Sequence, residues 1–204
     1  MTAFALAGVA SAATSPLVEG KNYARLANPQ PVETGKKIEV IEFFSYGCQH
    51  CADLEPYLDK WLAKLPSDVA FRRVPVLFHE AWARLARVYY TLDAMGDARK
   101  LSPAVFKAIH VDGIDLSDDT KFFGWAGKQG LDPKQVAAVY RSFAVDSKVK
   151  RAMQLGRDYA IESVPTVIVD GKFITSSDRV GGHAELPGAI DQLIAKARAE
   201  RAKG

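Results

Sequence analysis

Hydrophobic residues recur along this chain at two spacings, one typical of strands and one typical of helices. Residues 38–44 are almost continuously apolar, which indicates a central strand covered on both faces. Residues 53–65 then place apolar side chains on one face of a helix, at Leu54, Tyr57, Leu58, Trp61, Leu62 and Leu65. Pro56 is expected to kink that helix because proline removes a backbone donor. Residues 69–78 indicate a second strand, and Pro75 places it at an edge of the sheet.

The segment that follows, up to residue 160, shows helical spacing and predicts five helices. Ser102 is expected to cap the second of these helices, with the following proline at its first position. Asp118 and Asp132 stand where the third and fourth should begin, and residues 146–160 should form the fifth. Because these helices separate two groups of strands, they indicate a helical subdomain inserted into an α/β domain.

Strand spacing returns at residues 166–169, and the Asp-Gly pair at positions 170–171 is a strong signal for a hairpin turn. Residues 172–175 are expected to pair back across this turn. A final helix is predicted to begin near residue 185, with an apolar face formed by Ile190, Leu193, Ile194 and Ala197. Its charged end, residues 196–203, is expected to fray.

The first residues resemble the end of a secretory signal peptide. A short apolar run at residues 4–10 leads into an Ala-Ser-Ala pattern at residues 10–12, which is typical of cleavage before Ala13. No lysine or arginine precedes the run, so residues 1–12 are interpreted as a truncated signal, and a disordered Ala-rich terminus is the alternative. A genuine signal places the mature chain in an oxidising compartment.

Composition narrows the classes of function. Hydrophobic residues make up 48% of the 204 residues and charged residues 25%, which is ordinary for a globular protein with its own core. The formal net charge of +3 is too small to argue for nucleic-acid binding, and the sequence has no basic stripe with interleaved aromatic residues. We therefore expect no nucleic-acid partner.

The chain contains only two cysteines, Cys48 and Cys51, at the junction between the first predicted strand and helix. A Cys-x-x-Cys pair at such a junction indicates thiol–disulfide exchange, because two nearby sulfurs can close a ring and a helix N-terminus favours a thiolate. We expect Cys48 to be the exposed, acidic thiol and Cys51 to be the shielded, resolving thiol. His50 can add a positive charge that further favours the Cys48 thiolate.

Three other interpretations of the motif compete with redox exchange. A structural disulfide across so short a loop would remove little chain entropy. A zinc site usually needs four ligands, and the sequence has no second cysteine pair or His-x-x-x-His. A soft-metal site that uses Cys48, Cys51 and His50 remains open. The other histidines show no ligand spacing and are interpreted as surface or helix-end residues: His79, His110 and His183.

Four short segments carry a family resemblance. They are Glu42-Phe43-Phe44-Ser45 before Cys48, Val164-Pro165-Thr166 before the predicted hairpin, Gly171-Lys172-Phe173 within it, and Gly20-Lys21-x-Tyr23 near the start. Together they resemble the DsbA family of periplasmic thiol–disulfide oxidoreductases. The resemblance implies an α/β, thioredoxin-like fold with an inserted all-helical subdomain. Residues 13–78 and 149–204 would then form the thioredoxin-like domain, and residues 79–148 the insertion.

The resemblance also assigns substrate-binding residues. Pro165 is expected to form a cis peptide bond that faces the disulfide, so that Val164 presents its backbone to an extended substrate. The family's best-known dipeptide between the cysteines is Pro-His, and here it is Gln49-His50. Retention of His50 implies strong oxidising character, which Gln49, a further substrate-binding residue, could soften.

Acidic positions near the active site of the family match Glu42 and Glu55, which are expected to tune the thiols electrostatically. Arg73 stands at a basic position of the family. From the sequence alone, Glu42 either has a buried partner within the strand or points to solvent.

The function implied by the family is donation of the Cys48–Cys51 disulfide to reduced secreted proteins in the periplasm. The resemblance also implies re-oxidation by a quinone-linked, DsbB-like membrane partner. We expect a monomer with no cofactor and no metal. A disulfide reductase or isomerase on the same fold is one alternative, although such isomerases resemble dimers with an extra N-terminal domain, for which too few residues precede the motif. A soft-metal, copper-binding protein is the other.

Overall fold

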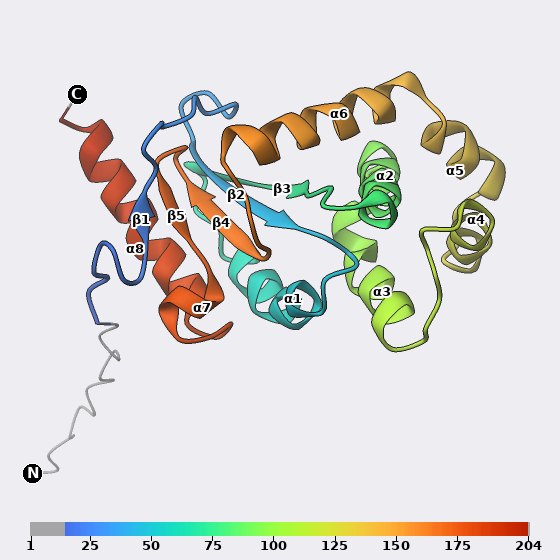
Figure 1. Cartoon of the computed structure of the whole chain (residues 1–204), viewed down its shortest axis with the longest axis horizontal. Helices are drawn as coiled ribbons and strands as arrows, with labels where there is room; N and C mark the ends of the chain where they lie inside the picture. The colour runs from blue at the N-terminus through green and yellow to red at the C-terminus, as the bar shows by residue number, and fades with distance from the viewer. Residues whose placement is uncertain (1–14, 204) are drawn as a thin grey trace, which may run out of the picture.

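The computed structural model describes residues 15–203, so the predicted signal peptide at residues 1–12 lies outside the described residues. Within the described residues, five strands form one mixed sheet in the order β1-β5-β4-β2-β3 (Figure 1). They are β1 (Ala24–Arg25), β2 (Ile38–Phe44), β3 (Val69–Pro75), β4 (Thr166–Val169) and β5 (Phe173–Thr175). Strand β2 is parallel to β3 and antiparallel to β4, and all of its residues are buried. The predicted central strand and the predicted edge strand after it are confirmed.

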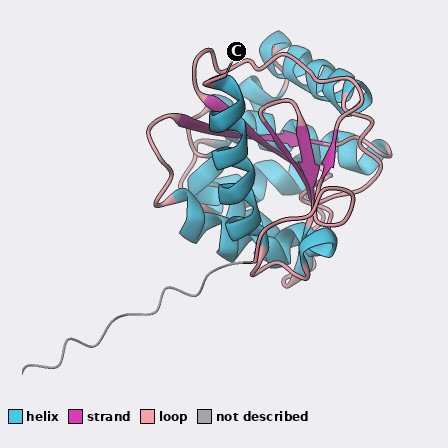
Figure 2. Cartoon of the chain, turned by 90° about the vertical axis from the view of Figure 1, so that its left-hand side faces the viewer, coloured by secondary structure: helices cyan, strands magenta, loops and turns pink. Residues whose placement is uncertain are grey.

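The helices of residues 15–203 cover both faces of this sheet. They are α1 (Gln49–Leu62), α2 (Glu80–Ala94), α3 (Ala98–His110), α4 (Asp119–Lys128), α5 (Pro133–Tyr140), α6 (Phe143–Asp158), α7 (Ser177–Val180) and α8 (Leu186–Arg201). Helix α8 packs against β2, β4 and α1 and stands in front of the sheet in Figure 2. Helices α2 to α5 gather beyond the end of β2, and α6 returns to contact β3 (Figure 1). No helix among these residues is long and apolar enough to cross a bilayer.

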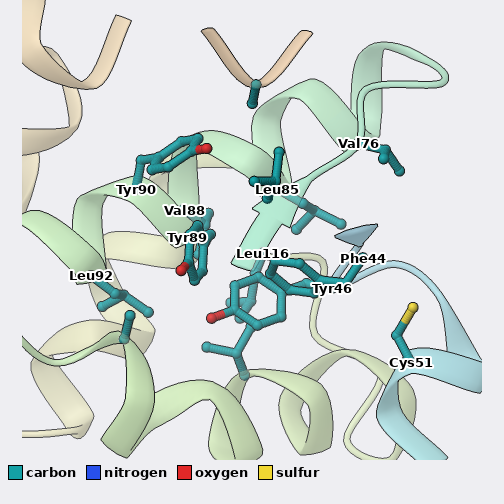
Figure 3. Close-up of a cluster of buried hydrophobic side chains, with 14 of the residues drawn as sticks. Phe44, Tyr46, Cys51, Val76, Leu85, Val88, Tyr89, Tyr90, Leu92 and Leu116 are labelled. Atoms are coloured by element: carbon teal, nitrogen blue, oxygen red, sulfur yellow. The ribbon is translucent and has the colours of Figure 1, made fainter. Parts of the chain in front are cut away.

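Two hydrophobic cores lie on the two sides of the sheet. Val40 and Val167 belong to the core that α1 and α8 cover. Phe43 belongs to the opposite core, where its ring lies 5.4 Å from that of Tyr159, just after α6. This second core continues into an aromatic cluster at the end of β2, formed by Phe44, Tyr46 and Tyr89, with Cys51 at its margin (Figure 3). The core packing thus reaches directly to the cysteine motif.

Two helices begin where the sequence predicts a cap. The Asp118 and Asp132 carboxylates accept hydrogen bonds from the backbone N–H groups of Lys121 and Lys134, each at 2.9 Å. Such bonds satisfy donors that the first turn of a helix cannot satisfy internally. The predicted starts of α4 and α5 are therefore confirmed.

Ser102 lies inside α3 rather than at its start, so the prediction that it caps this helix is wrong. The Ser102 hydroxyl donates a hydrogen bond to the Ala98 carbonyl at 2.8 Å and lies 2.7 Å from the Tyr46 hydroxyl. A buried serine is tolerated within a helix when its hydroxyl bonds the carbonyl one turn earlier. The same hydroxyl ties α3 to the segment that precedes the cysteine motif.

Helix α1 begins at Gln49, earlier than predicted, and continues through Pro56. Cys48 itself caps the helix, and a pattern of apolar positions contains no sign of such a cap. Tyr57 is 39% exposed, so its predicted place on the buried face is wrong, whereas Leu54 and Leu58 are completely buried. The start of α1 is therefore set by the Cys48 cap, and Cys51 in the first turn already belongs to the core.

Helix α6 begins at Phe143, before the predicted residue 146, because the Ser142 hydroxyl caps it through the backbone N–H of Val145 at 3.3 Å. The predicted boundary between insertion and domain, at residues 148/149, falls within this helix. Helix α6 contacts both α2 and β3, so it joins the two parts. The division of the chain at that position stays a prediction.

The charged end of α8 is helical to Arg201, so the predicted fraying from residue 196 is wrong. The Arg201 guanidinium pairs with the buried carboxylate of Asp170 in the hairpin turn. Arg198 pairs with Asp68 at 2.7 Å. These two contacts fasten the end of α8 to loops of the sheet, and they join residues far apart in sequence.

The turn between β4 and β5 has the conformation that its Asp-Gly pair predicts, with φ of 56° at Asp170 and 63° at Gly171. A Cβ at Gly171 would lie 2.0 Å from the Gln30 carbonyl oxygen. Gly171→Ala should therefore destabilise the fold by more than the roughly 1–2 kcal/mol cost of a left-handed alanine. Gly96→Ala is the control, because Gly96 has φ of 80° and open space around it. An equal loss of unfolding free energy in the two variants, measured by urea unfolding, would contradict a role for the close approach of Gln30 to Gly171.

Candidate active site

The cysteine motif lies where the chain turns from β2 into α1. Cys48 has extended backbone angles, and its sulfur accepts a hydrogen bond from the Cys51 N–H at 3.3 Å. Both cysteines are free thiols, and Cys51 is completely buried one turn into the helix. Cys48 is only 8% exposed, so the expectation of an exposed thiol is wrong. The Val164 carbonyl oxygen lies 3.6 Å from the Cys48 sulfur, so the segment before β4 contributes to this burial.

The surroundings of Cys48 favour its thiolate. The largest influence is a hydrogen bond from the Cys51 thiol, and the backbone N–H groups of Cys51 and His50 act in the same direction against the effect of burial. The charge of His50 adds to them. Together they lower the pKa of Cys48 to about 7, whereas burial raises the pKa of Cys51 far above its usual range. The motif thus concentrates negative charge on Cys48.

Gln49 and His50 are both exposed at the start of α1. The Gln49 amide donates a hydrogen bond to the Asp53 carboxylate at 2.8 Å, which fixes its direction along the helix. The imidazole rings of His50 and His183 have centroids 6.2 Å apart. No spacing rule connects these two histidines, and only the fold brings the loop after α7 to the start of α1.

The segment before β4 faces the motif. The Val164-Pro165 bond is cis, and the Cys48 thiol donates a long hydrogen bond to the Val164 carbonyl, with 3.6 Å between sulfur and oxygen. A cavity of about 290 Å³ lies beside this contact, and His50, Val164, Pro165 and His183 are among the residues that line it. Gln49 lines a different cavity, between α1 and α3. The structure therefore brings Val164 and Pro165 to the groove next to Cys48, and it directs Gln49 elsewhere.

Three buried charged side chains connect the sheet with α1. Glu42 and Arg73 are paired residues of β2 and β3, and the Arg73 Nε donates a hydrogen bond to Glu42 at 2.7 Å. The terminal nitrogens of Arg73 donate to both carboxylate oxygens of Glu55 at 2.6 and 3.1 Å. None of the three is more than 7% exposed. The question that the sequence left open for Glu42 is thereby answered, because its partner is the buried Arg73.

This triad of Glu42, Glu55 and Arg73 contains two carboxyl groups but only one positively charged group. Burial raises the pKa of Glu42 and raises that of Glu55 to about 7, although Arg73 attracts both carboxylates. Two buried carboxyl groups thus share one guanidinium, and a proton remains on the pair up to about pH 7. The charge of Glu42 also contributes to the high pKa of Cys51. The triad therefore opposes ionisation of the buried thiol.

Neither cysteine belongs to a group of three or more side chains spaced to hold a metal ion, as far as residues 15–203 are concerned. A soft-metal site made of Cys48, Cys51 and His50 would need all three ligand atoms to converge. The geometry of the motif therefore supports redox exchange rather than metal storage.

A mixed sheet, a Cys-x-x-Cys pair at a helix start and a facing cis-proline segment define a dithiol–disulfide oxidoreductase of the thioredoxin type. Residues 39–186 match the family model of the DSBA-like thioredoxin domain. The chain belongs to this family, and the predicted family and fold class are confirmed.

Similar proteins agree with this assignment. The chain is 38% identical over 199 residues to the thiol:disulfide interchange protein DsbA of Pseudomonas syringae pv. tomato, a match that covers 98% of this chain and 93% of the relative. The crystal structure of Pseudomonas aeruginosa DsbA superposes with a TM-score of 0.87 at 37% identity, covering 92% of this chain and 97% of that one. For the oxidoreductase NmDsbA1 from Neisseria meningitidis the TM-score is 0.83 at 33% identity, covering 93% and 98%. The protein is a thiol:disulfide oxidoreductase, and the copper-binding and isomerase alternatives are not favoured.

Proposed function

We propose that this protein oxidises reduced secreted proteins in the periplasm by donating a Cys48–Cys51 disulfide. The observation that carries the proposal is the contrast between the two thiols, with a Cys48 pKa of about 7 and a Cys51 pKa far above the usual range. A stabilised thiolate favours the reduced protein. The disulfide form is therefore the less stable one and passes its bond to other thiols.

The exchange proceeds in two steps. A substrate thiolate attacks the Cys48 sulfur, the Cys48–Cys51 bond breaks, and Cys51 leaves with its electron pair and takes up a proton. A second substrate thiolate then attacks the substrate sulfur of the mixed disulfide, and Cys48 leaves as a thiolate. The substrate has lost two electrons and gained a disulfide, and both cysteines of the protein are reduced.

Substrate binding is assigned to the groove beside Cys48. The Val164 carbonyl, which accepts the Cys48 S–H in the reduced form, can accept an N–H from an extended substrate strand instead. Pro165 lacks an N–H and lines the cavity next to it. Gln49 keeps its predicted role in substrate binding, but at the cavity between α1 and α3 rather than in the groove beside Val164.

The buried triad is assigned to electrostatic tuning. The charge of Glu42 disfavours the Cys51 thiolate, and Glu55 acts indirectly, because it shares the Arg73 guanidinium with Glu42. In the reduced protein Cys51 therefore stays protonated, and the negative charge resides on Cys48.

Repeated turnover needs an acceptor for the two electrons that each substrate leaves on the protein. We assign this role to a quinone-linked, DsbB-like membrane protein, and we place the enzyme in the periplasm as a monomer. The curated relatives that support this are bacterial DsbA proteins. We also retain the division into a thioredoxin-like domain, residues 13–78 and 149–204, and a helical insertion, residues 79–148.

A reduced substrate with two cysteines tests the proposed direction of exchange. The oxidised protein should form the substrate disulfide in a stoichiometric reaction, much faster than glutathione disulfide does at the same concentration. Reduction of insulin and repair of a scrambled disulfide substrate should both be slower. A protein that repairs scrambled substrate faster than it oxidises reduced substrate contradicts the proposal.

The His50 side chain should contribute measurably to the oxidising strength. His50→Ala removes the imidazole charge but keeps the backbone N–H, so the Cys48 pKa should rise by about one unit or less. The equilibrium constant with glutathione should then shift up to about tenfold, or roughly 30 mV, toward a weaker oxidant. His79→Ala is the control because His79 packs on Trp82 and is not among the groups that lower the Cys48 pKa. An unchanged equilibrium constant in His50→Ala would remove His50 from this role.

A further inference from the structure

Three side chains converge beside the motif. His50 and Asp53 lie one turn apart on α1, and His183 reaches them from the loop after α7. Each offers one ligand atom, and the three atoms lie within 4.8 Å of one another. His50 and Asp53 are exposed and His183 is half-buried, so the cluster is open to solvent on one side. Neither cysteine is part of it.

Neighbouring residues hold two of these side chains in place. The Gln49 amide donates a hydrogen bond to Oδ1 of Asp53 at 2.8 Å, which leaves the other carboxylate oxygen available. The Ser177 hydroxyl lies 2.7 Å from Nδ1 of His183, which leaves Nε2 of that ring available. Protein metal sites commonly show such supporting contacts, because they fix the orientation of the ligands.

The spacing and charge of the cluster suit a cation. For three atoms no more than 4.8 Å apart, some point lies within about 2.8 Å of all three, so movements under about 1 Å reach zinc–ligand distances. Within residues 15–203, the Asp53 carboxylate forms no ion pair with Lys, Arg or His. Two imidazoles and one carboxylate are ligands for zinc, nickel or copper ions rather than for calcium or magnesium.

We propose that His50, Asp53 and His183 form a binding site for one divalent ion of the zinc class. Three protein ligands leave a fourth position open for water. The ion would lie against the cavity that Val164 and Pro165 also line, so an occupied site narrows the approach to Cys48. This site uses no sulfur, and it forms equally in the disulfide form of the protein.

The test is calorimetric titration of Zn²⁺ into the full-length protein with its cysteines locked as a disulfide, which removes thiol ligands. One Zn²⁺ should bind per chain, and binding should weaken about tenfold or more in His183→Gln and in Asp53→Asn. His79→Ala should bind as the wild type does, and excess Ca²⁺ should not compete. Circular dichroism confirms that each variant is folded.

Three results of the Zn²⁺ titrations would overturn the proposal, and a fourth comes from the Ca²⁺ competition. They are the absence of Zn²⁺ binding to the disulfide form, equal affinity in the wild type and both ligand variants, and an equal loss in His79→Ala. Competition by Ca²⁺ at similar concentrations would also overturn it, because general attraction to negative charge would then explain the binding. Because the disulfide form is used, a failure here leaves the thiol chemistry of Cys48 untouched.

Discussion

Replacement of Cys48 by serine should reduce dithiol oxidation to the rate measured without protein. The Cys48 sulfur is the one that a substrate attacks, because it borders the groove beside Val164, and the stabilised Cys48 thiolate is the leaving group of the second step. Cys51 cannot take over, since it is completely buried and its pKa is raised. The effect is measured with a reduced two-cysteine peptide as the substrate, by recording how fast its free thiols disappear.

Cys51→Ser is the matched control for this result. It retains the reactive Cys48 but lacks the resolving thiol, so a mixed disulfide formed with glutathione disulfide should persist. Mass spectrometry should find one glutathione per chain in Cys51→Ser and none in Cys48→Ser over the same time. Equal labelling of both variants would show that the two sulfurs are equally reactive, which contradicts the assigned roles.

Replacement of Arg73 by methionine should destabilise the protein by about 3–5 kcal/mol at pH 7, because it leaves two buried carboxyl groups without their cation. Urea unfolding of the reduced protein measures the loss. The triple variant with Arg73→Met, Glu42→Gln and Glu55→Gln should recover most of the stability, since it contains no unpaired buried charge. Arg198→Met, which removes an exposed pair with Asp68, should change stability little. A loss no larger in Arg73→Met than in Arg198→Met would contradict the electrostatic role of the triad.

The same triad predicts a pH dependence with a definite sign. The unfolded chain releases the Glu55 proton near its ordinary pKa of 4.5, whereas the folded protein retains it to about 7. Between these values the unfolded state binds fewer protons, so this group makes stability fall as pH rises. Glu55→Gln should remove this group's contribution to the slope of unfolding free energy against pH, measured by urea unfolding between pH 4.5 and 7. A slope unchanged by the substitution would contradict the raised pKa.

Much of the architecture follows from local pattern and chemistry. The apolar run at residues 38–44 predicts β2 because a strand covered on both faces has no polar side. Asp118 and Asp132 predict helix starts because a cap is a local hydrogen bond, and the Asp-Gly turn predicts its hairpin for a similar reason. The predictions fail where the position of a residue depends on contacts with residues that are distant in the sequence. Ser102 resembles a cap, but contact with Tyr46 and the Ala98 carbonyl keeps it inside α3.

In the candidate site, too, local residues are predictable from the sequence and contacts between distant residues are not. Cys48, His50 and Cys51 are adjacent in sequence, so a motif identifies them. The exposure of Cys48 depends on Val164, which belongs to a segment far along the chain, and the sequence prediction of an exposed sulfur fails there. The approach of His183 to His50 likewise arises only when α7 and α1 are brought together by the sheet. Rules based on sequence spacing do not predict contacts between residues so far apart in the chain.

The pKa of the Cys48 thiol is the most direct test of the thiolate account. Thiolate absorbance of the reduced protein, corrected with the disulfide form, should rise with a single midpoint near pH 7. The stability that this thiolate gives to the reduced fold is fully present above the ordinary thiol pKa of 9.0 and is lost as pH falls through about 7. Cys51 should not titrate in that range. A midpoint near 9.0, the ordinary value of the thiol, would contradict the account.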